Sequence, residues 1–285
     1  MTNNTSLINL GDLSKPATVL IEKISDAIGG IFRPYQMKRI AKAETEAAKI
    51  RALADIEIKE IQQRALVRFV KEETKKQINI EEIVKKTISQ LKDNARPQDI
   101  ENDWITNFFE KCRLISDEEM QQLWSKVLAG EANNPGIYSK RTVNFISTLD
   151  KSDARLFTTF CSFIWVIGDL VPLIYDPDNE IYTKNGVHFN ALKHLDDIGL
   201  IRFDPLAGFR RIKQPEEIQV FYYGQPVKLK FKNKENNSLG LGEALLSKVG
   251  QELVPITGSK PIPEFFDFII EKWSKMDLTI THPAT

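Results

Sequence analysis

The sequence has few of the residues on which secreted proteins and many enzymes depend. Its 285 residues include only two cysteines, Cys112 and Cys161, and three histidines. Two cysteines far apart in apolar helical surroundings favour buried, reduced thiols over a disulfide framework or a catalytic nucleophile. The histidines have no partner at the spacing of a metal site, so we predict no metal site and no cofactor.

Motifs that mark nucleotide-binding and hydrolytic enzymes are also missing. The chain has no G-x-x-x-x-G-K-[ST] phosphate loop, no G-x-G-x-x-G turn and no G-x-S-x-G nucleophile motif. Glu118, Glu119 and Glu131 are candidates for acid–base chemistry, but Glu118 and Glu119 face partly apart on a helix and no histidine lies near them. We therefore expect no catalytic residue and a protein that is not an enzyme.

An excess of one charge and a long apolar run are lacking as well. Lys+Arg and Asp+Glu both number 39, so no basic excess indicates nucleic acid. The longest apolar run, residues 160–173, is interrupted by polar residues and is too short to span a bilayer. No signal peptide is predicted, because the first residues lack a basic segment followed by an apolar core. We expect a cytoplasmic protein, with peripheral contact at the inner membrane face as an alternative.

Proline and glycine are absent from residues 35–76, and this absence predicts a long helical arm. Small and branched apolar residues recur there every three or four positions, as one face of a helix requires. So long a helix cannot bury a narrow apolar stripe by itself, and we expect it to associate with further copies of the chain. The residues predicted to mediate self-association are Ile40, Ala47, Ile50, Ala54, Ile61 and Ala65.

A shorter amphipathic helix is predicted before the arm, over residues 16–32. The preferred interpretation is that its apolar face packs on protein, because its polar face lacks the lysine and arginine expected of a helix that binds anionic lipid. Contact with a membrane surface is the alternative. The residues that would make this contact are Leu20, Ile24, Ile28, Ile31 and Phe32.

Four helices are predicted in the middle of the chain, the last of which is short and buries Val143, Ile146 and Leu149. The first covers residues 79–96, and a second follows Pro97. Ser116 and Glu119 form an S-x-x-E capping box that predicts the start of a third helix, and Gly130 is expected to end it. Trp124 lies in the apolar stripe of this helix and is predicted to be buried.

The last 130 residues change from helical to mixed patterns. We predict an apolar helix over residues 154–170, a hairpin of residues 173–175 with 180–183, a helix ended by Gly199, and a strand in which residues 227–231 alternate. Together with the ending "LSKVGQELVPI", these elements predict a winged-helix-like domain.

Basic residues in this domain are candidates for contact with DNA. The acidic pairs Asp196–Asp197 and Glu216–Glu217 lie beside them and disfavour tight binding, because helices that read bases usually carry few paired acids. We expect weak nucleic-acid binding at most. The candidate contacts are Arg210, Arg211, Lys228, Lys230 and Lys232.

Together these elements predict a fold class and three domains. The fold class is mainly α, with a long N-terminal helical arm, a helical middle domain and a C-terminal winged-helix-like α+β domain. The arm and the helix before it occupy residues 1–78, the middle domain residues 79–153, and the winged-helix-like domain residues 154–285.

Residues 117–157 resemble two known groups of proteins. The stretch "DEEMQQLWSKVLAGEANNPGIYSKRTVNFISTLDKSDARLF" resembles a bacterial family catalogued as a domain of unknown function, and this resemblance covers most of the chain. It is more distantly similar to the abortive-infection alpha proteins of phage-defence loci, over about residues 80–170. The shared residues are Glu119, Leu123, Trp124, Val127, Leu128, Ala129, Leu149, Asp153 and Ala154.

This resemblance implies a shared fold and a defence context, and it carries over no catalytic residue. The resulting prediction is a non-enzymatic oligomeric interaction protein that acts in anti-phage defence by abortive infection. Its partners would be further copies of itself and another protein. The alternatives are a winged-helix DNA-binding regulator and a defence effector that acts at the membrane surface through residues 16–32.

Overall fold

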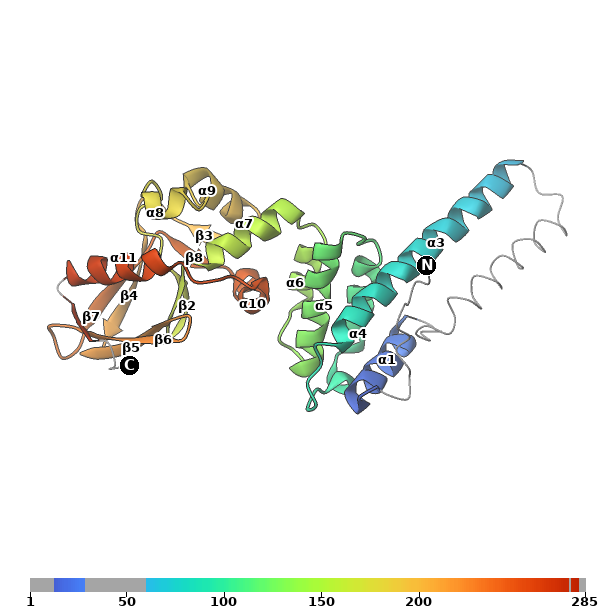
Figure 1. Cartoon of the computed structure of the whole chain (residues 1–285), viewed down its shortest axis with the longest axis horizontal. Coiled ribbons are helices and arrows are strands. Elements are labelled where there is room, and N and C mark those ends of the chain that lie inside the picture. The colour runs from blue at the N-terminus through green and yellow to red at the C-terminus, as the bar shows by residue number, and fades with distance from the viewer. Residues whose placement is uncertain (1–12, 29–59, 277, 282–285) are drawn as a thin grey trace, which may run out of the picture. The chain divides into compact units, whose positions relative to one another are not determined.

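A computed structural model describes residues 13–28, 60–276 and 278–281 (Figure 1). The chain forms two compact units, residues 1–147 and 148–285. About 53% of the described residues are helical and 17% are in strands, which form several antiparallel sheets. The predicted mainly α fold class is therefore wrong, and the protein has a mixed α+β fold.

The first unit is built from helices. Trp104 stacks on Phe108 with ring centroids 5.2 Å apart, and Trp124 meets Phe108 edge-on at 5.0 Å. Trp124 is 0% exposed, as its position in an apolar stripe predicted. The elements of this unit are α1 (Lys15–Ala27), α3 (Glu60–Ile88), η2 (Pro97–Asp99), α4 (Asn102–Cys112), α5 (Glu118–Asn133) and α6 (Lys140–Ile146).

Helix α3 continues past the end that the sequence pattern indicated. We predicted an arm helix that ends near residue 76 and a separate helix from residue 79, but one helix runs from Glu60 to Ile88. No proline or glycine interrupts these residues, so the backbone has no reason to break there. Asn79 sits inside the helix, and its side-chain amide donates to the backbone oxygen of Arg113 at 2.9 Å.

Both predicted ends of the tryptophan helix, α5, need correction. The capping residue is Asp117 rather than Ser116, because its carboxylate accepts the backbone N–H groups of Glu119 and Met120. Gly130 does not end the helix, which continues to Asn133. Gly130 instead lets Tyr138 pack against the backbone, since a Cβ at this position would lie 2.6 Å from the tyrosine ring.

The second unit combines helices with three sheets. The largest is a five-stranded antiparallel sheet in the order β2-β1-β5-β6-β9, and two pairs, β3–β8 and β4–β7, complete the set. The elements are α7 (Lys151–Cys161), β1 (Ile164–Ile167), β2 (Asp169–Pro172), α8 (Glu180–Thr183), α9 (Phe189–Asp197), β3 (Ile201–Phe203), β4 (Phe209–Gln214), β5 (Glu217–Tyr222), β6 (Gln225–Lys230), β7 (Asn237–Gly242), β8 (Ala244–Leu246), α10 (Lys248–Thr257), α11 (Pro263–Ser274) and β9 (Thr279–Thr281).

The β1–β2 hairpin overturns the winged-helix-like prediction. It occupies residues that were predicted to continue α7, which ends at Cys161. The branched residues of β1 favour a strand, and Gly168 makes the turn with a φ of +73°. The predicted hairpin partner at residues 180–183 is helix α8, whose first turn is capped by the side chain of Asn179.

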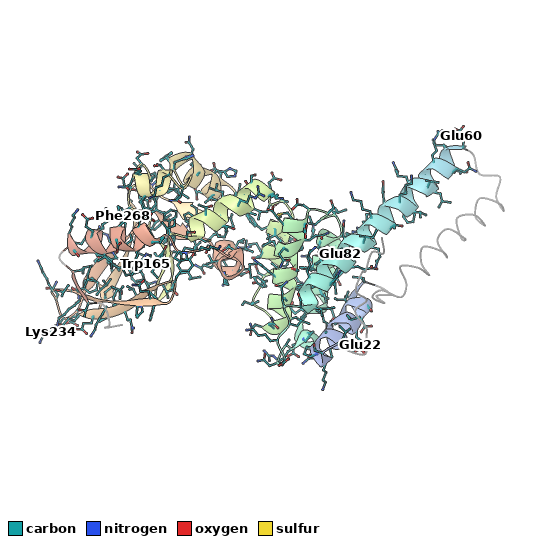
Figure 2. All side chains as sticks on the ribbon, viewed as in Figure 1. Glu22, Glu60, Glu82, Trp165, Lys234 and Phe268 are labelled. Carbon is teal, nitrogen blue, oxygen red and sulfur yellow. The ribbon has the colours of Figure 1, made fainter. Side chains whose placement is uncertain are left out.

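An aromatic core joins α11 to the large sheet. Trp165 of β1 is 0% exposed and contacts Trp273 and Phe266 of α11, with ring centroids 4.9 and 5.5 Å apart. Figure 2 shows Trp165 and Phe268 in this unit. The predicted alternation in β6 is confirmed, because Val227 and Leu229 are both 0% exposed while the lysines between and after them are exposed. Gly199 also follows the end of α9, as predicted, with a φ of +86°.

Candidate protein-interaction surfaces

The N-terminal half of α3 carries an exposed line of apolar residues. Ile61 is 66% exposed and Phe69 is 60% exposed, and Ala65 between them is exposed too. At four-residue spacing these three side chains follow one another along one side of the helix. We call Ile61, Ala65 and Phe69 the α3 row. Two of its members, Ile61 and Ala65, were predicted to mediate self-association.

The α3 row lies on the same side of the helix that is buried further along. Eighteen residues make five turns of an α-helix, so Ile61, Ala65 and Phe69 align with residues 79, 83 and 87. Those three later residues, Asn79, Ile83 and Thr87, are 5%, 0% and 0% exposed, because this end of α3 packs against α5. Among the described residues, this side of α3 is therefore buried by the first unit from Asn79 onward and exposed in the half that precedes it.

A series of charged side chains of both signs, also at four-residue spacing, begins one position before the α3 row. Arg64 Nη1 lies 2.6 Å from Glu60 Oε1, and Arg68 Nε lies 3.5 Å from Glu72 Oε1. All four side chains are more than half exposed, so these ion pairs contribute little to stability. Lys76 continues the series one turn later and pairs with Glu73 at 2.6 Å. We call residues 60, 64, 68, 72 and 76 the charged row.

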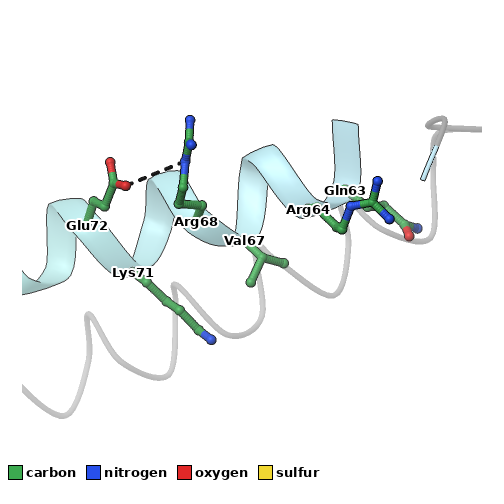
Figure 3. Close-up of a pocket in the computed structure, with 6 residues that line it drawn as sticks. All are labelled: Gln63, Arg64, Val67, Arg68, Lys71 and Glu72. Atoms are coloured by element: carbon green, nitrogen blue, oxygen red, sulfur yellow. Dashed lines mark ion pairs between the residues drawn. The ribbon is translucent and has the colours of Figure 1, made fainter. Parts of the chain in front are cut away.

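Other residues of α3 line a shallow pocket on a different side. Figure 3 shows this pocket, in which Val67 and Lys71 point away from Arg68 and Glu72. Gln63 and Arg64 complete its lining with these four residues. The pocket shares its charged lining with the charged row and contains no member of the α3 row. Figure 2 shows Glu60 at the end of the described helix that is distant from the body of the unit, and Glu82 near that body.

The remaining residues predicted to self-associate lie outside the part of the chain that the structure describes. These are Ile40, Ala47, Ile50 and Ala54.

The apolar face of α1 is largely covered by the first unit itself. Leu20 and Ile24, two of the residues predicted to touch a membrane, are each 0% exposed, and α1 packs against η2 and α4. Ile28 is half-buried at the end of the helix, and Ile31 and Phe32 lie outside the described residues. None of the helices among the described residues is both long enough and apolar enough to cross a membrane.

Acidic side chains surround most of the predicted DNA contacts. Lys228 pairs with Glu217 at 2.5 Å, and Lys230 pairs with Glu216 at 3.1 Å and with Glu217 at 3.6 Å. The Glu217 carboxyl has its pKa lowered, first by its hydrogen bond with Lys228. These lysines already have negative partners, so a phosphate would have to compete for them.

Of the other three basic candidates, one makes structural contacts and two are exposed on the surface. Arg211 pairs with Asp169 at 2.6 Å and also donates to the backbone oxygen of Ile167, which ties β4 to the turn of the β1–β2 hairpin. Arg210 and Lys232 are exposed.

The third acidic candidate for catalysis, Glu131, holds a turn together. It is 2% exposed, and its two carboxylate oxygens accept the backbone N–H groups of Gly136 at 2.6 Å and Tyr138 at 3.0 Å. Burial raises its pKa, although these hydrogen bonds act in the opposite direction. Glu118 and Glu119 lie in the first turn of α5, far along the helix from Glu131. No group of three metal-binding side chains occurs among the described residues.

The two cysteines are free and buried, as predicted. Burial raises the pKa of both thiols. A buried thiol with a raised pKa is a poor nucleophile, because the reactive form is the thiolate.

One feature was not anticipated from the sequence. The charged row follows an E-x-x-x-R-x-x-x-R-x-x-x-E-x-x-x-K pattern over residues 60–76, and its opposite charges at i and i+4 are readable without a structure. Only the exposure of the neighbouring α3 row shows that these charges flank an uncovered apolar surface.

A family model described as "Protein of unknown function (DUF2806)" matches residues 63–270. The chain belongs to this family. The family match begins in the exposed half of α3 and ends in α11, so it covers parts of both compact units. No curated protein and no solved structure matches the chain.

Proposed function

We propose that this protein is a non-enzymatic oligomeric interaction protein that binds protein partners through the α3 row. The observation that carries the proposal is the exposure of Ile61 and Phe69 on a helix face that is buried from Asn79 onward. Large apolar side chains gathered on one exposed face are typical of protein-binding surfaces. Exposed apolar residues also occur elsewhere in the chain, but these two lie in line with a packed interface.

The chemistry of the described titratable groups supports an interaction role over catalysis. Buried groups are used to hold the fold: Tyr182 donates to the backbone oxygen of Leu173 at 2.7 Å, and Tyr175 donates to that of Gly240 at 2.8 Å. Burial raises the pKa of Tyr175 to about 12, so its hydroxyl stays protonated at neutral pH. These hydroxyls serve as hydrogen-bond donors rather than as acids or bases.

The finer proposal is a role in anti-phage defence in the bacterial cytoplasm. Its support is the resemblance of residues 80–170 to abortive-infection alpha proteins. Trp124, Val127 and Leu128 of the shared phrase are each 0% exposed. These three shared residues are packing residues, and they support a common fold and context but no shared chemistry.

Sedimentation velocity of the full chain tests the interaction proposal. Wild type should be oligomeric at micromolar concentration, and Phe69→Glu should weaken assembly about 30-fold, as the loss of an aromatic anchor does. Leu206→Glu is the matched control, because Leu206 is 97% exposed and belongs to the second unit. A wild-type monomer, or equal weakening by both variants, would refute the proposal.

The defence role needs a separate test in cells. Expression of wild type in a phage-sensitive bacterium should lower the number of plaques, and Phe69→Glu at equal protein level should not. If wild type protects against none of a broad panel of phages, the defence proposal fails while the interaction proposal stands.

A further inference from the structure

We propose that four buried polar residues hold α3 in a single axial position on the first unit. Asn79 and Thr87 of α3 and Gln121 and Ser125 of α5 are 5%, 0%, 6% and 0% exposed. We call these four residues the polar seam. They lie where α3 packs on α5 and on α4. This positioning holds whether or not the exposed half of α3 binds a partner.

The polar seam is costly to bury. Among the described residues, eight polar or charged residues are buried, and four of them belong to the seam. A polar side chain loses free energy on leaving water unless it finds a hydrogen-bond partner. Apolar residues of similar size would bury without this requirement, so stability alone does not account for the seam. A hydrogen bond adds a requirement on position, which an apolar contact lacks.

Two side-chain hydrogen bonds align α3 with α5. Lys86 Nζ donates to Gln121 Oε1 at 2.8 Å, and Gln90 Nε2 donates to Ser125 Oγ at 3.0 Å. The partners are 35 residues apart in both cases, so the two helices run in the same direction here and match turn for turn. The amide of Gln121 also donates to the backbone oxygen of Ile115 at 3.0 Å. Gln121 is therefore bound through both ends of its amide group.

The two seam residues of α3 bind backbone oxygens. Asn79 Nδ2 donates to the oxygen of Arg113, just after the end of α4, at 2.9 Å. The hydroxyl of Thr87 donates to the oxygen of Ile83 at 2.8 Å and lies 3.4 Å from the backbone oxygen of Ser125. Backbone oxygens cannot follow a moving helix as flexible side chains can. The oxygen of Arg113 therefore sets where Asn79 must lie.

The C-terminal end of α3 is fastened to α5 as well. Asn133, the last residue of α5, accepts the backbone N–H of Lys92 through Oδ1 at 2.9 Å. Its Nδ2 donates to the backbone oxygen of Gln90 at 3.2 Å. Both contacts hold the residues that directly follow α3, which ends at Ile88. The helix is thus held at its end and along its buried half.

A shift of α3 by one turn would break the contacts of the polar seam. Every residue of α3 would move by about 5.4 Å, which is beyond the reach of a hydrogen bond. In one direction Ile83 would take the place of Thr87, and Asn79 would move into the place of Ile83 and lose the oxygen of Arg113. A buried amide without a partner disfavours this register. Apolar contacts alone discriminate poorly, because one branched aliphatic side chain can replace another.

Distances between spin labels on the full chain measure the register of α3. Cys112 and Cys161 are 0% and 1% exposed and should stay unlabelled. Lys71→Cys on α3 is labelled together with Lys111→Cys on α4 or with Asn144→Cys on α6, all exposed positions of the first unit. Dilution with unlabelled chain removes distances between copies. Each pair should give one narrow distance distribution in an otherwise wild-type chain.

Replacement of the whole seam by apolar residues provides the test. The quadruple variant is Asn79→Leu, Thr87→Val, Gln121→Met and Ser125→Ala. It should fold, with a thermal midpoint within about 5 °C of wild type or higher, because packed apolar residues can replace buried polar ones without loss of stability. Its distance distributions should broaden or gain a second maximum displaced by up to about 5 Å, which is one helical turn.

Ile83→Val is the matched control, because Ile83 is 0% exposed and lies between Asn79 and Thr87 on the same side of α3. It should lower the thermal midpoint and keep the wild-type distances. Wild-type distances in the quadruple variant would overturn the register role. So would a quadruple variant that fails to fold, since the seam would then hold the fold itself. Equal broadening in Ile83→Val would assign the effect to looser packing and overturn the role too.

Discussion

The carboxylate of Glu131 on α5 accepts the backbone N–H of Tyr138, seven residues later, at 3.0 Å. The carbonyl oxygen of Tyr138 in turn accepts the indole N–H of Trp104 at 2.8 Å. Glu131 thereby fixes the turn between α5 and α6, and this turn holds α4 in place. A buried carboxyl in this position makes folding depend on its protonation.

Stability should fall with rising pH because of Glu131. Its pKa in the folded protein is raised by burial, so the folded state keeps this proton at pH values where the unfolded state has lost it. The contribution is complete below the ordinary glutamate pKa and is lost as pH rises through the raised one. The free energy of unfolding of wild type, relative to Glu131→Gln, should decrease over this window and then level off. A difference that is independent of pH, measured by urea unfolding, would contradict the prediction.

Replacing Trp124 should strongly destabilise the first unit. The side chain is 0% exposed and meets Phe108 edge-on. Trp124→Ala should lower the free energy of unfolding by about 3–5 kcal/mol, as large aromatic truncations in cores do. The control is Leu114→Ala, whose side chain is 65% exposed and whose effect should stay within about 0.5 kcal/mol. Unchanged thermal unfolding of Trp124→Ala would show that this residue does not hold the core.

Both native thiols should react slowly with a thiol-specific reagent at neutral pH. Burial excludes the reagent and raises the pKa of Cys112 and Cys161, so little thiolate is present. The colour reaction with a disulfide reagent should become at least about 100-fold faster in denaturant, where both thiols are accessible. Reaction of one thiol within seconds in the native protein would show that its surroundings open readily.

Binding of duplex DNA should be weak and should depend steeply on salt. Lys228 and Lys230 are already paired with Glu216 and Glu217, so binding must break these contacts. Anisotropy titrations of the full chain across a salt series should give no sequence preference and no tight binding at physiological salt. Nanomolar binding that is lost in the Lys228, Lys230, Lys232→Glu triple variant would show instead that the lysines form a DNA contact.

Local patterns predicted the parts of the fold that depend on periodicity. The alternation around Leu229 and the apolar stripe around Trp124 can be read from the sequence, because both periods are strong. The strand at Trp165 was missed, since a short apolar run does not distinguish a buried helix from a buried strand. The role of Glu131 could not be read, because its partners are backbone N–H groups that approach only when the turn has formed.

Only part of the candidate surface could be predicted from the sequence, for a similar reason. The sequence marks Ile61 and Ala65 as apolar positions on a helix, but it does not show where the body of the unit stops covering that helix. This boundary depends on the tertiary contacts of α3, whose first buried residue is Asn79. The break that we predicted near residue 76 coincides with this end of the packed region and not with an end of the helix.

Because the buried residues of α3 begin at Asn79 while the helix itself continues through this point, its described backbone amides should fall into two exchange classes. Amide hydrogens of residues 60–78 can exchange with solvent through local opening of the exposed half, which requires little energy. Those of residues 79–88 are released only when the core of the first unit opens. A partner bound to the exposed half would slow the exchange of its amides as well. Deuterium uptake measured on peptides of α3 would therefore report binding without a covalent label or a mutation.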